Sequence, residues 1–253
     1  MKHYPKIRLF TTAPLQESAQ VELSKEQAHY LVNVMRRREN DEILIFNGTD
    51  GEFRANIISA SKKNCTLNIL EQTRKQQAQP DIWLCFAPVK NAPITNIIQK
   101  ATELGASLLQ PVITKHTVVT RVNTERLVAN AVEAAEQSMR ITVPVINEPM
   151  QLEKLLSNWD MERKLIFCDE SGGGEHIIHA LSRLEKHAKY AVLIGPEGGF
   201  AESEFALLRN KPYVVPVGMG PRIFRADTAA LVALASVFSI VGDWDEKPGF
   251  RPE

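Results

Sequence analysis

The sequence predicts an α/β protein that joins a small N-terminal β-barrel to a larger domain built on a mostly parallel sheet. Within residues 1–73, short β-type runs and turn signals dominate, and one helical pattern interrupts them. Beyond Pro80, apolar β-type runs alternate with helical patterns, which is typical of a parallel sheet covered by helices. The polar segment 73–80 ends in that proline and marks the linker. We therefore expect two domains, residues 1–73 and residues 74–253.

The N-terminal domain is expected to contain short strands and one helix. Gly48-Thr49-Asp50-Gly51 has the composition of a hairpin turn. Ser24 and Gln27 have the spacing of a capping box, and Ala28, Leu31, Val32 and Met35 follow with helical periodicity. The expected strands are Glu42–Asn47, Glu52–Ser59 and Lys63–Glu71.

The C-terminal domain is expected to alternate strands with helices. The strands are Ile82–Ala87, Leu108–Ile113, Lys164–Asp169, Tyr190–Ile194 and Tyr213–Val217. The helices are Pro93–Leu104, Thr124–Met139, Leu152–Asn158, Glu175–His187, Glu202–Arg209 and Asp227–Val241.

Composition limits the possible classes. The 30 basic and 30 acidic residues cancel, so total charge gives no indication of a nucleic-acid partner. Three widely spaced cysteines without a Cys-x-x-Cys pattern favour reduced thiols over a disulfide framework. No apolar stretch reaches the roughly 18 to 20 residues that span a bilayer, and the N-terminus lacks a signal-peptide core. We expect a cytoplasmic protein without a membrane span.

Two turn-rich segments follow predicted strands and precede predicted helices. The first is Ile194-Gly195-Pro196-Glu197-Gly198-Gly199-Phe200, and the second is Val217-Gly218-Met219-Gly220-Pro221-Arg222-Ile223-Phe224-Arg225. Ligands of open α/β sheets bind at such strand ends, and glycines let a ligand approach the backbone closely. Neither segment has the dinucleotide or P-loop fingerprint. The alternatives are tight connections without a ligand, and arginines paired with Glu197 or Asp227.

Several other patterns have a structural interpretation beside a functional one. The helix 227–241 is apolar around its circumference, which requires burial inside the fold or against a partner subunit. Arg36-Arg37-Arg38 completes a helix end or contacts phosphate. Ser171-Gly172-Gly173-Gly174 binds an anion or is a flexible loop. His176 and His179 have no third ligand in view, so we expect no metal.

The two turn-rich segments together closely resemble the bacterial 16S ribosomal RNA uracil-N3 methyltransferases of the SPOUT superfamily. The match runs through Gly195-Pro196-Glu197-Gly198-Gly199-Phe200 and then from Gly220 to Ala229. Residues 29–37 and 46–48 look like the PUA-like barrel of that family, and residues 100–106 and 133–140 look like two further family blocks.

The resemblance implies a trefoil-knotted domain that binds S-adenosylmethionine and works as a homodimer. It also implies methylation of uridine N3 in 16S rRNA, at uracil 1498 of the decoding region, with the 30S subunit as the expected context. Other RNA sites, a ribose 2′-hydroxyl or transfer RNA remain alternatives. A non-catalytic RNA-binding assembly factor is another.

Roles are carried over onto matching residues. Arg225, Arg222 and Glu197 are expected to act in catalysis. The expected cofactor residues are Ile194, Gly195, Pro196, Glu197, Gly198, Gly199, Val217, Gly218, Met219, Gly220, Ile223 and Phe224. The expected RNA-binding residues are Arg8, Arg36, Arg37, Arg38, Arg121 and Arg140. The chain departs from the usual family pattern at Ala226, which lacks a hydroxyl, and at Asp227, which shortens an acidic arm and is also a good helix N-cap.

Overall fold

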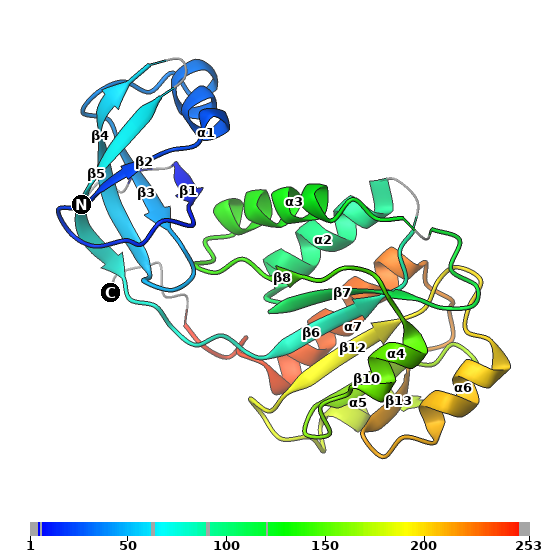
Figure 1. Cartoon of the computed structure of the whole chain (residues 1–253). Coiled ribbons are helices and arrows are strands. Elements are labelled where there is room, and N and C mark those ends of the chain that lie inside the picture. The colour runs from blue at the N-terminus through cyan, green and yellow to red at the C-terminus, as the bar shows by residue number, and fades with distance from the viewer. Residues whose placement is uncertain (1–4, 6, 62–63, 90–91, 120, 248–253) are drawn as a thin grey trace. The chain divides into compact units, whose positions relative to one another are not determined.

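A computed structural model describes residues 5, 7–61, 64–89, 92–119 and 121–247. The chain forms two compact units (Figure 1). The first unit contains the described residues up to Ala78 together with Ala135–Val143. The second contains Gln79–Ala134 and Pro144–Lys247. A segment from the middle of the chain, 135–143, thus belongs to the N-terminal unit, which the expected boundary after residue 73 does not include.

The first unit is a five-stranded sheet with one short helical segment. Its strands occur in the order β1-β3-β4-β5-β2. Strands β1 and β3 are parallel, and the other pairs are antiparallel. Irregularities of register between β4 and β5 increase the local bend of the sheet. The bounds are β1 Arg8–Phe10, β2 Gln20–Glu22, β3 Glu42–Phe46, β4 Glu52–Ala60 and β5 Cys65–Arg74.

Local chemistry explains the predicted turn and helix start of this unit. Asn47 Oδ1 accepts hydrogen bonds from the N–H groups of Thr49 and Asp50, which closes the turn between β3 and β4. The capping box of Ser24 and Gln27 is present at the start of α1, Lys25–His29. The chain then continues as a π-helix, Tyr30–Val34, which the helical periodicity did not predict.

The second unit is built on a parallel sheet in the order β11-β13-β10-β12-β6-β7-β8, with β9 also paired to β7. Its long strands are β6 Ile82–Phe86, β7 Leu108–Ile113, β10 Lys164–Cys168, β12 Tyr190–Ile194 and β13 Val214–Gly218. The short strands are β8 Val145–Ile146, β9 Met150–Gln151 and β11 Glu175–His176. The sequence predicted all five long strands to within one residue at each end.

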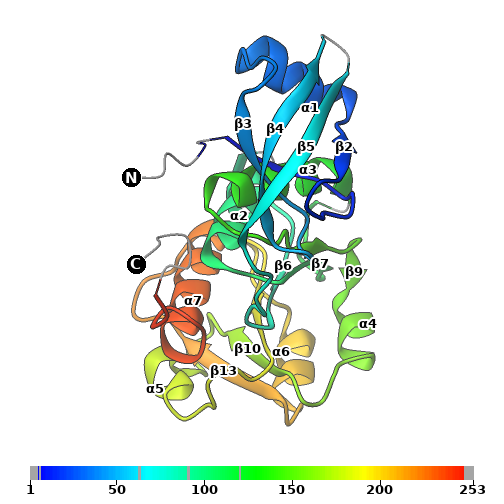
Figure 2. The ribbon, with the colours of Figure 1, turned by 90° about the vertical axis from the view of Figure 1, so that its left-hand side faces the viewer.

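Helices cover both faces of this sheet (Figure 2). Helices α2 (Ala92–Leu104), α5 (Ile177–Leu181) and α7 (Ala226–Val241) lie on one face. Helices α4 (Leu152–Ser157) and α6 (Glu202–Arg209) lie on the other, where they pack on alternate sheet residues such as Leu165 and Phe167. Helix α3 spans Thr124–Gln137.

One helix prediction needs correction. The helix expected over Glu175–His187 is much shorter, because Glu175 and His176 extend the sheet as β11 and the helix ends at Leu181. The predicted strand start at Lys63 lies outside the described residues. Within the described part of the chain, no helix combines the length and the apolar character that a membrane crossing needs.

Candidate functional site

The site lies at the carboxyl ends of three adjacent strands, β13, β10 and β12. A cavity of about 430 Å³ opens there, within the range of about 300 to 1,000 Å³ that is usual for small-molecule sites. Both turn-rich segments of the sequence line it, one after β12 and the other after β13. The two loops that were expected to bind a ligand therefore line one cavity, and their binding role stays a prediction.

Glycines shape the first wall of the cavity. A Cβ atom on Gly195 would lie 2.5 Å from the ring of Phe200, and that ring is buried against Phe167. Gly199 has φ +70°, and a Cβ there would meet the Glu170 carboxylate at 2.7 Å. A side chain at position 195 would have to displace the Phe200 ring, and the left-handed backbone at position 199 favours glycine.

Three side chains from other parts of the unit hold this wall in place. Glu170 accepts a hydrogen bond from the Phe200 N–H at 2.9 Å. The buried Glu204 accepts one from Ala201 N–H at 2.8 Å and one from Lys115 N–H at 2.9 Å. His116 Nδ1 lies 3.1 Å from the carbonyl oxygen of Gly198. Of these three residues, Glu170 lines the cavity, whereas Glu204 and His116 support the wall from outside it.

The second turn-rich segment forms the second wall of the cavity. A third wall is formed by Cys168, the last residue of β10, and by Asp169, Glu170 and Gly172, which were not among the expected site residues. Asp169 is buried, and its carboxylate accepts hydrogen bonds from Ser171 and Arg209. Burial alone would raise the pKa of Asp169, but these hydrogen bonds outweigh it and hold the pKa below its ordinary value. The run Ser171–Gly174 was the available sequence signal, because it also follows a strand.

The cavity contains no activated thiol. Cys168 lines it, but burial raises the pKa of this thiol to about 12. A thiol with that pKa stays protonated near neutral pH and is a poor nucleophile. The arrangement therefore gives no support to covalent cysteine chemistry.

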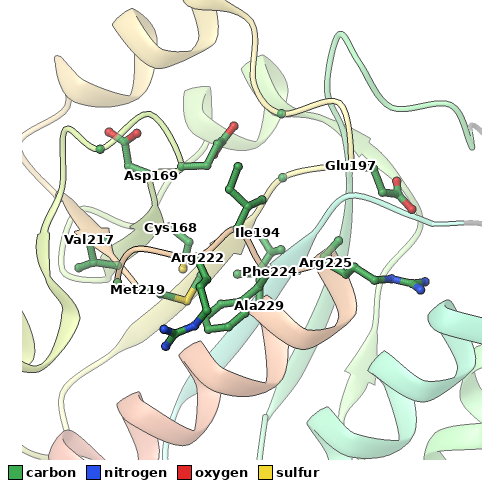
Figure 3. A pocket seen from close by; sticks show the side chains of 18 of the residues that line it. Cys168, Asp169, Ile194, Glu197, Val217, Met219, Arg222, Phe224, Arg225 and Ala229 are labelled. Carbon is green, nitrogen blue, oxygen red and sulfur yellow. The ribbon is translucent and has the colours of Figure 1, made fainter.

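The second turn-rich segment provides an apolar side and two cations. Met219 and Phe224 line the cavity, while Arg222 and Arg225 are both exposed. Their side chains extend to opposite sides of the segment, and Glu197 lies on the side of Arg225 (Figure 3). Arg225 Nε is 3.6 Å from Asp227 Oδ1, so the ion pair to Asp227 is present, and the side chain still keeps 73% of its surface exposed.

Helix α7 begins at Ala226, directly after Arg225 in the chain. Arg225 is its N-cap residue and uses no side-chain hydrogen bond for that role. Asp227 lies in the first turn, where it accepts a hydrogen bond from Thr228 N–H at 3.0 Å. The idea that Asp227 is the N-cap is therefore wrong. Its charge still complements the positive helix end.

The arginines expected to bind RNA differ in exposure. Arg36 and Arg38 are exposed, and Arg37 is partly exposed with its guanidinium 3.9 Å from Asp41. Arg121 is exposed in the second unit, and Arg140 is partly buried.

Arg8 is buried and fully engaged. Its guanidinium binds Glu52 at 2.7 Å and donates to the backbone carbonyls of Ala135, Glu136 and Arg140. No surface remains on it for a phosphate, so we correct this assignment: Arg8 fastens segment 135–143 within the first unit.

Among the described residues, no group of three or more histidine, cysteine or acidic side chains has the arrangement of a metal site. The glycine cradle, the apolar side and the cavity volume fit a mid-sized organic ligand such as S-adenosylmethionine.

Comparison with known proteins relates this geometry to a family. A model described as RNA methyltransferase domain matches residues 75–238, and one described as RNA methyltransferase PUA domain matches residues 23–70. Ribosomal RNA small subunit methyltransferase E of Rickettsia conorii is 32% identical, covering 91% of this chain and 94% of that protein. The protein of the same name from Bacillus subtilis is 31% identical, with 90% and 93% covered.

A solved structure agrees with these relatives. The ribosomal RNA small subunit methyltransferase E of Neisseria gonorrhoeae, bound to S-adenosyl methionine, superposes with a TM-score of 0.84 at 26% identity. The superposition covers 96% of this chain and 100% of that one.

Proposed function

The chain belongs to the ribosomal RNA small subunit methyltransferase E family, and on that premise we propose that it methylates N3 of a uridine in 16S rRNA, the uracil 1498 implied by the resemblance. The observation that carries the proposal is the cavity at three strand ends, where a glycine cradle adjoins two exposed arginines. One feature suits a bound organic cofactor and the other suits an anionic acceptor.

The cofactor would lie in the cavity against the backbone of Gly195 and Gly218 and against the side chains of Met219 and Phe224. Ile194 and Val217, at the ends of their strands, would form its floor. When bound, S-adenosylmethionine supplies the methyl group. The glycine cradle would fix the position of the cofactor, and fixed placement of donor and acceptor contributes to rate.

The acceptor chemistry sets demands on the remaining residues. Uridine N3 carries the proton that is used in base pairing, so the base must be unpaired or flipped before transfer. Loss of that proton leaves negative charge on the uracil ring and its oxygens. Arg225, with most of its surface exposed beside the cavity, is placed to stabilise this charge.

Arg222 and Glu197 have different roles in the proposal. Arg222 extends to the opposite side from Arg225 (Figure 3). We therefore assign it to a phosphate of the RNA backbone or to a contact with a second copy of the chain. Glu197 lies on the Arg225 side of the cavity, where it would orient that arginine or receive the N3 proton.

We further propose a homodimer formed through α7. The helix buries one face in its own unit, yet Leu231, Val232 and Ala235 remain partly exposed on it. A partly exposed apolar stripe is stabilised when a second copy covers it. We also propose that this unit forms the trefoil knot that the resemblance implies.

The RNA surface of the first unit would comprise Arg36, Arg37 and Arg38, which follow the π-helix. The π-helix is itself an irregularity often found at functional sites. Arg140 of the first unit and Arg121 of the second are the other residues that we propose to contact RNA. The 30S subunit and the cytoplasm are the proposed setting.

The decisive experiment is mapping of methylated nucleotides in rRNA from cells with and without the gene. Loss of one N3-methyluridine from 16S rRNA is the expected result. Loss of a 2′-O-methyl group or of a transfer-RNA modification would replace the proposed acceptor. Unchanged RNA, together with absence of S-adenosylmethionine binding by calorimetry, would favour a non-catalytic binding factor.

Arg225→Ala tests the catalytic assignment. We expect methyl transfer to fall by about 100-fold or more with cofactor binding retained, as for removal of an oxyanion donor. Normal turnover in this variant would overturn the role of Arg225.

A further inference from the structure

The second unit contains another cavity, at the same edge of the parallel sheet as the cofactor site. Its volume is about 240 Å³. It lies beyond the ends of β6 and β7, which follow β12 in the sheet order. Val89, Val119 and Leu127 give it an apolar lining, while Thr95, Arg121 and Arg126 bring polar groups to it. None of these residues belongs to the cofactor cavity.

Two arginines bring positive charge to this cavity. Arg121 and Arg126 are both exposed, and neither guanidinium has an ion pair or hydrogen bond within the part of the chain that the structure describes. Among the described residues that line the cavity, none is acidic. Two arginines without acidic partners at one opening form a site for an anion that can accept several hydrogen bonds.

Two helices contribute residues to this cavity. Helix α3 begins at Thr124, and Asn123 Oδ1 accepts a hydrogen bond from the Arg126 N–H at 2.9 Å. The first turn of α2 lines the same cavity through Ile94 and Thr95. Residues of the first turns of both helices therefore border this cavity.

The size of the cavity selects the ligand. At about 240 Å³ it is smaller than the range of about 300 to 1,000 Å³ usual for whole small-molecule ligands. It suits a flat or compact apolar fragment with an anion at its mouth. A nucleotide within an RNA strand has this composition, since its base or ribose is joined to a phosphate.

One loop connects this cavity with the cofactor site. The segment after β7 places His116 against the Gly198 carbonyl and then places Val119 and Arg121 in the second cavity. A strand of RNA whose target base reaches the cofactor site would pass close to this loop.

We propose that the second cavity binds one nucleotide of the RNA substrate, outside the methylated uridine, with Arg121 and Arg126 on its phosphate. The base or ribose of that nucleotide packs against the apolar lining. This proposal rests on the proposed function only for the identity of the RNA.

The test measures binding of the full-length protein to 30S subunits from cells that lack the gene. We expect Arg121→Ala and Arg126→Ala each to weaken binding about tenfold. Affinity falls as salt rises, and we expect each variant to make the slope of log affinity against log salt less steep by about 0.7 to 0.9. Lys154→Ala, which removes an exposed charge on α4, is the matched control and should change neither quantity.

A second pair of variants tests the cavity itself. Thr95→Phe fills it while keeping both arginines, so subunit binding should weaken with little change in salt slope, and Thr95→Ser should bind normally. Calorimetry with S-adenosylmethionine should give wild-type affinity for every variant, which excludes misfolding.

The outcomes separate the two proposals. Wild-type subunit affinity and salt slope in both arginine variants would overturn the cavity proposal, even if methylation proceeds. If the variants lose binding but the wild-type protein methylates no uridine, the cavity proposal holds and the proposed function fails. If the wild-type protein does not bind the subunit at all, both fail.

Discussion

Replacement of Glu204 by glutamine tests whether the cofactor wall is held from outside the cavity. The side chain of Glu204 is 1% exposed, and its two oxygens accept from Ala201 N–H and Lys115 N–H at 2.8 and 2.9 Å. A glutamine keeps one carbonyl oxygen but turns an NH₂ group toward the other N–H. One charge-assisted bond is lost and the other is weakened.

The magnitude follows from these two contacts. A hydrogen bond to a charged group contributes about 1.5 to 3 kcal/mol. The loss of at least one should therefore lower the free energy of unfolding by about 1.5 to 3 kcal/mol. Ala201 directly follows Phe200, the last residue of the first cavity wall, so part of this loss should weaken cofactor binding. We expect the Kd for S-adenosylmethionine to rise by up to about tenfold, since 1.4 kcal/mol corresponds to a factor of ten.

Urea denaturation and calorimetry measure the two effects, and Glu202→Gln is the matched control. Glu202 lies in the same first turn of α6 but is exposed, so its replacement removes an equal charge without a buried hydrogen bond. Wild-type stability and cofactor affinity in Glu204→Gln would refute the reasoning. Equal losses in both variants would assign the effect to helix-end charge instead.

Three further predictions concern the buried pair, the glycine cradle and the third wall. Arg8→Met should cost about 3 to 5 kcal/mol of unfolding free energy, because it leaves the Glu52 charge buried without its partner, and adding Glu52→Gln should recover part of this in urea denaturation. Gly195→Ala should cost about 1 to 3 kcal/mol and weaken cofactor binding in calorimetry, since the added Cβ meets the Phe200 ring at 2.5 Å; normal affinity would contradict the cradle. The pKa of Asp169 is lowered in the folded protein, so its stabilising contribution is complete above the unfolded pKa near 3.8 and is lost as pH falls through the folded pKa. Asp169→Asn should therefore flatten the acid side of a profile of unfolding free energy against pH. An unchanged profile would argue against a stabilising Asp169–Arg209 pair.

Local sequence patterns predicted the elements well where a single periodicity ran without interruption. The strand Tyr190–Ile194 and the helix Glu202–Arg209 have the predicted bounds. The helix prediction failed at Glu175 and His176, which pair with β13 instead of joining the helix. That pairing joins Glu175 to Val217, a residue more than forty positions away, and no local pattern contains it.

The site was predictable in part for the same reason. Glycine-rich segments after Ile194 and Val217 have a local signature, and both line the cavity. The wall after Cys168 was not assigned because nothing local shows that β10 lies between β12 and β13. Arg8 was misassigned because its sequence neighbours do not reveal the three carbonyls, from residues 135 to 140, that bury it.

The sequence alone determined where most strands and helices of this protein form and which two glycine-bearing loops follow β12 and β13, because periodicity, capping and glycine placement act over a few residues. The tertiary structure decided everything that depends on distant neighbours. It set the order of strands that brings a third wall to the cofactor cavity, and it buried Arg8 beneath segment 135–143. It also gathered Arg121 and Arg126 around a second cavity on the same sheet edge. These features follow from packing of segments that are far apart in the chain, which local propensities do not encode.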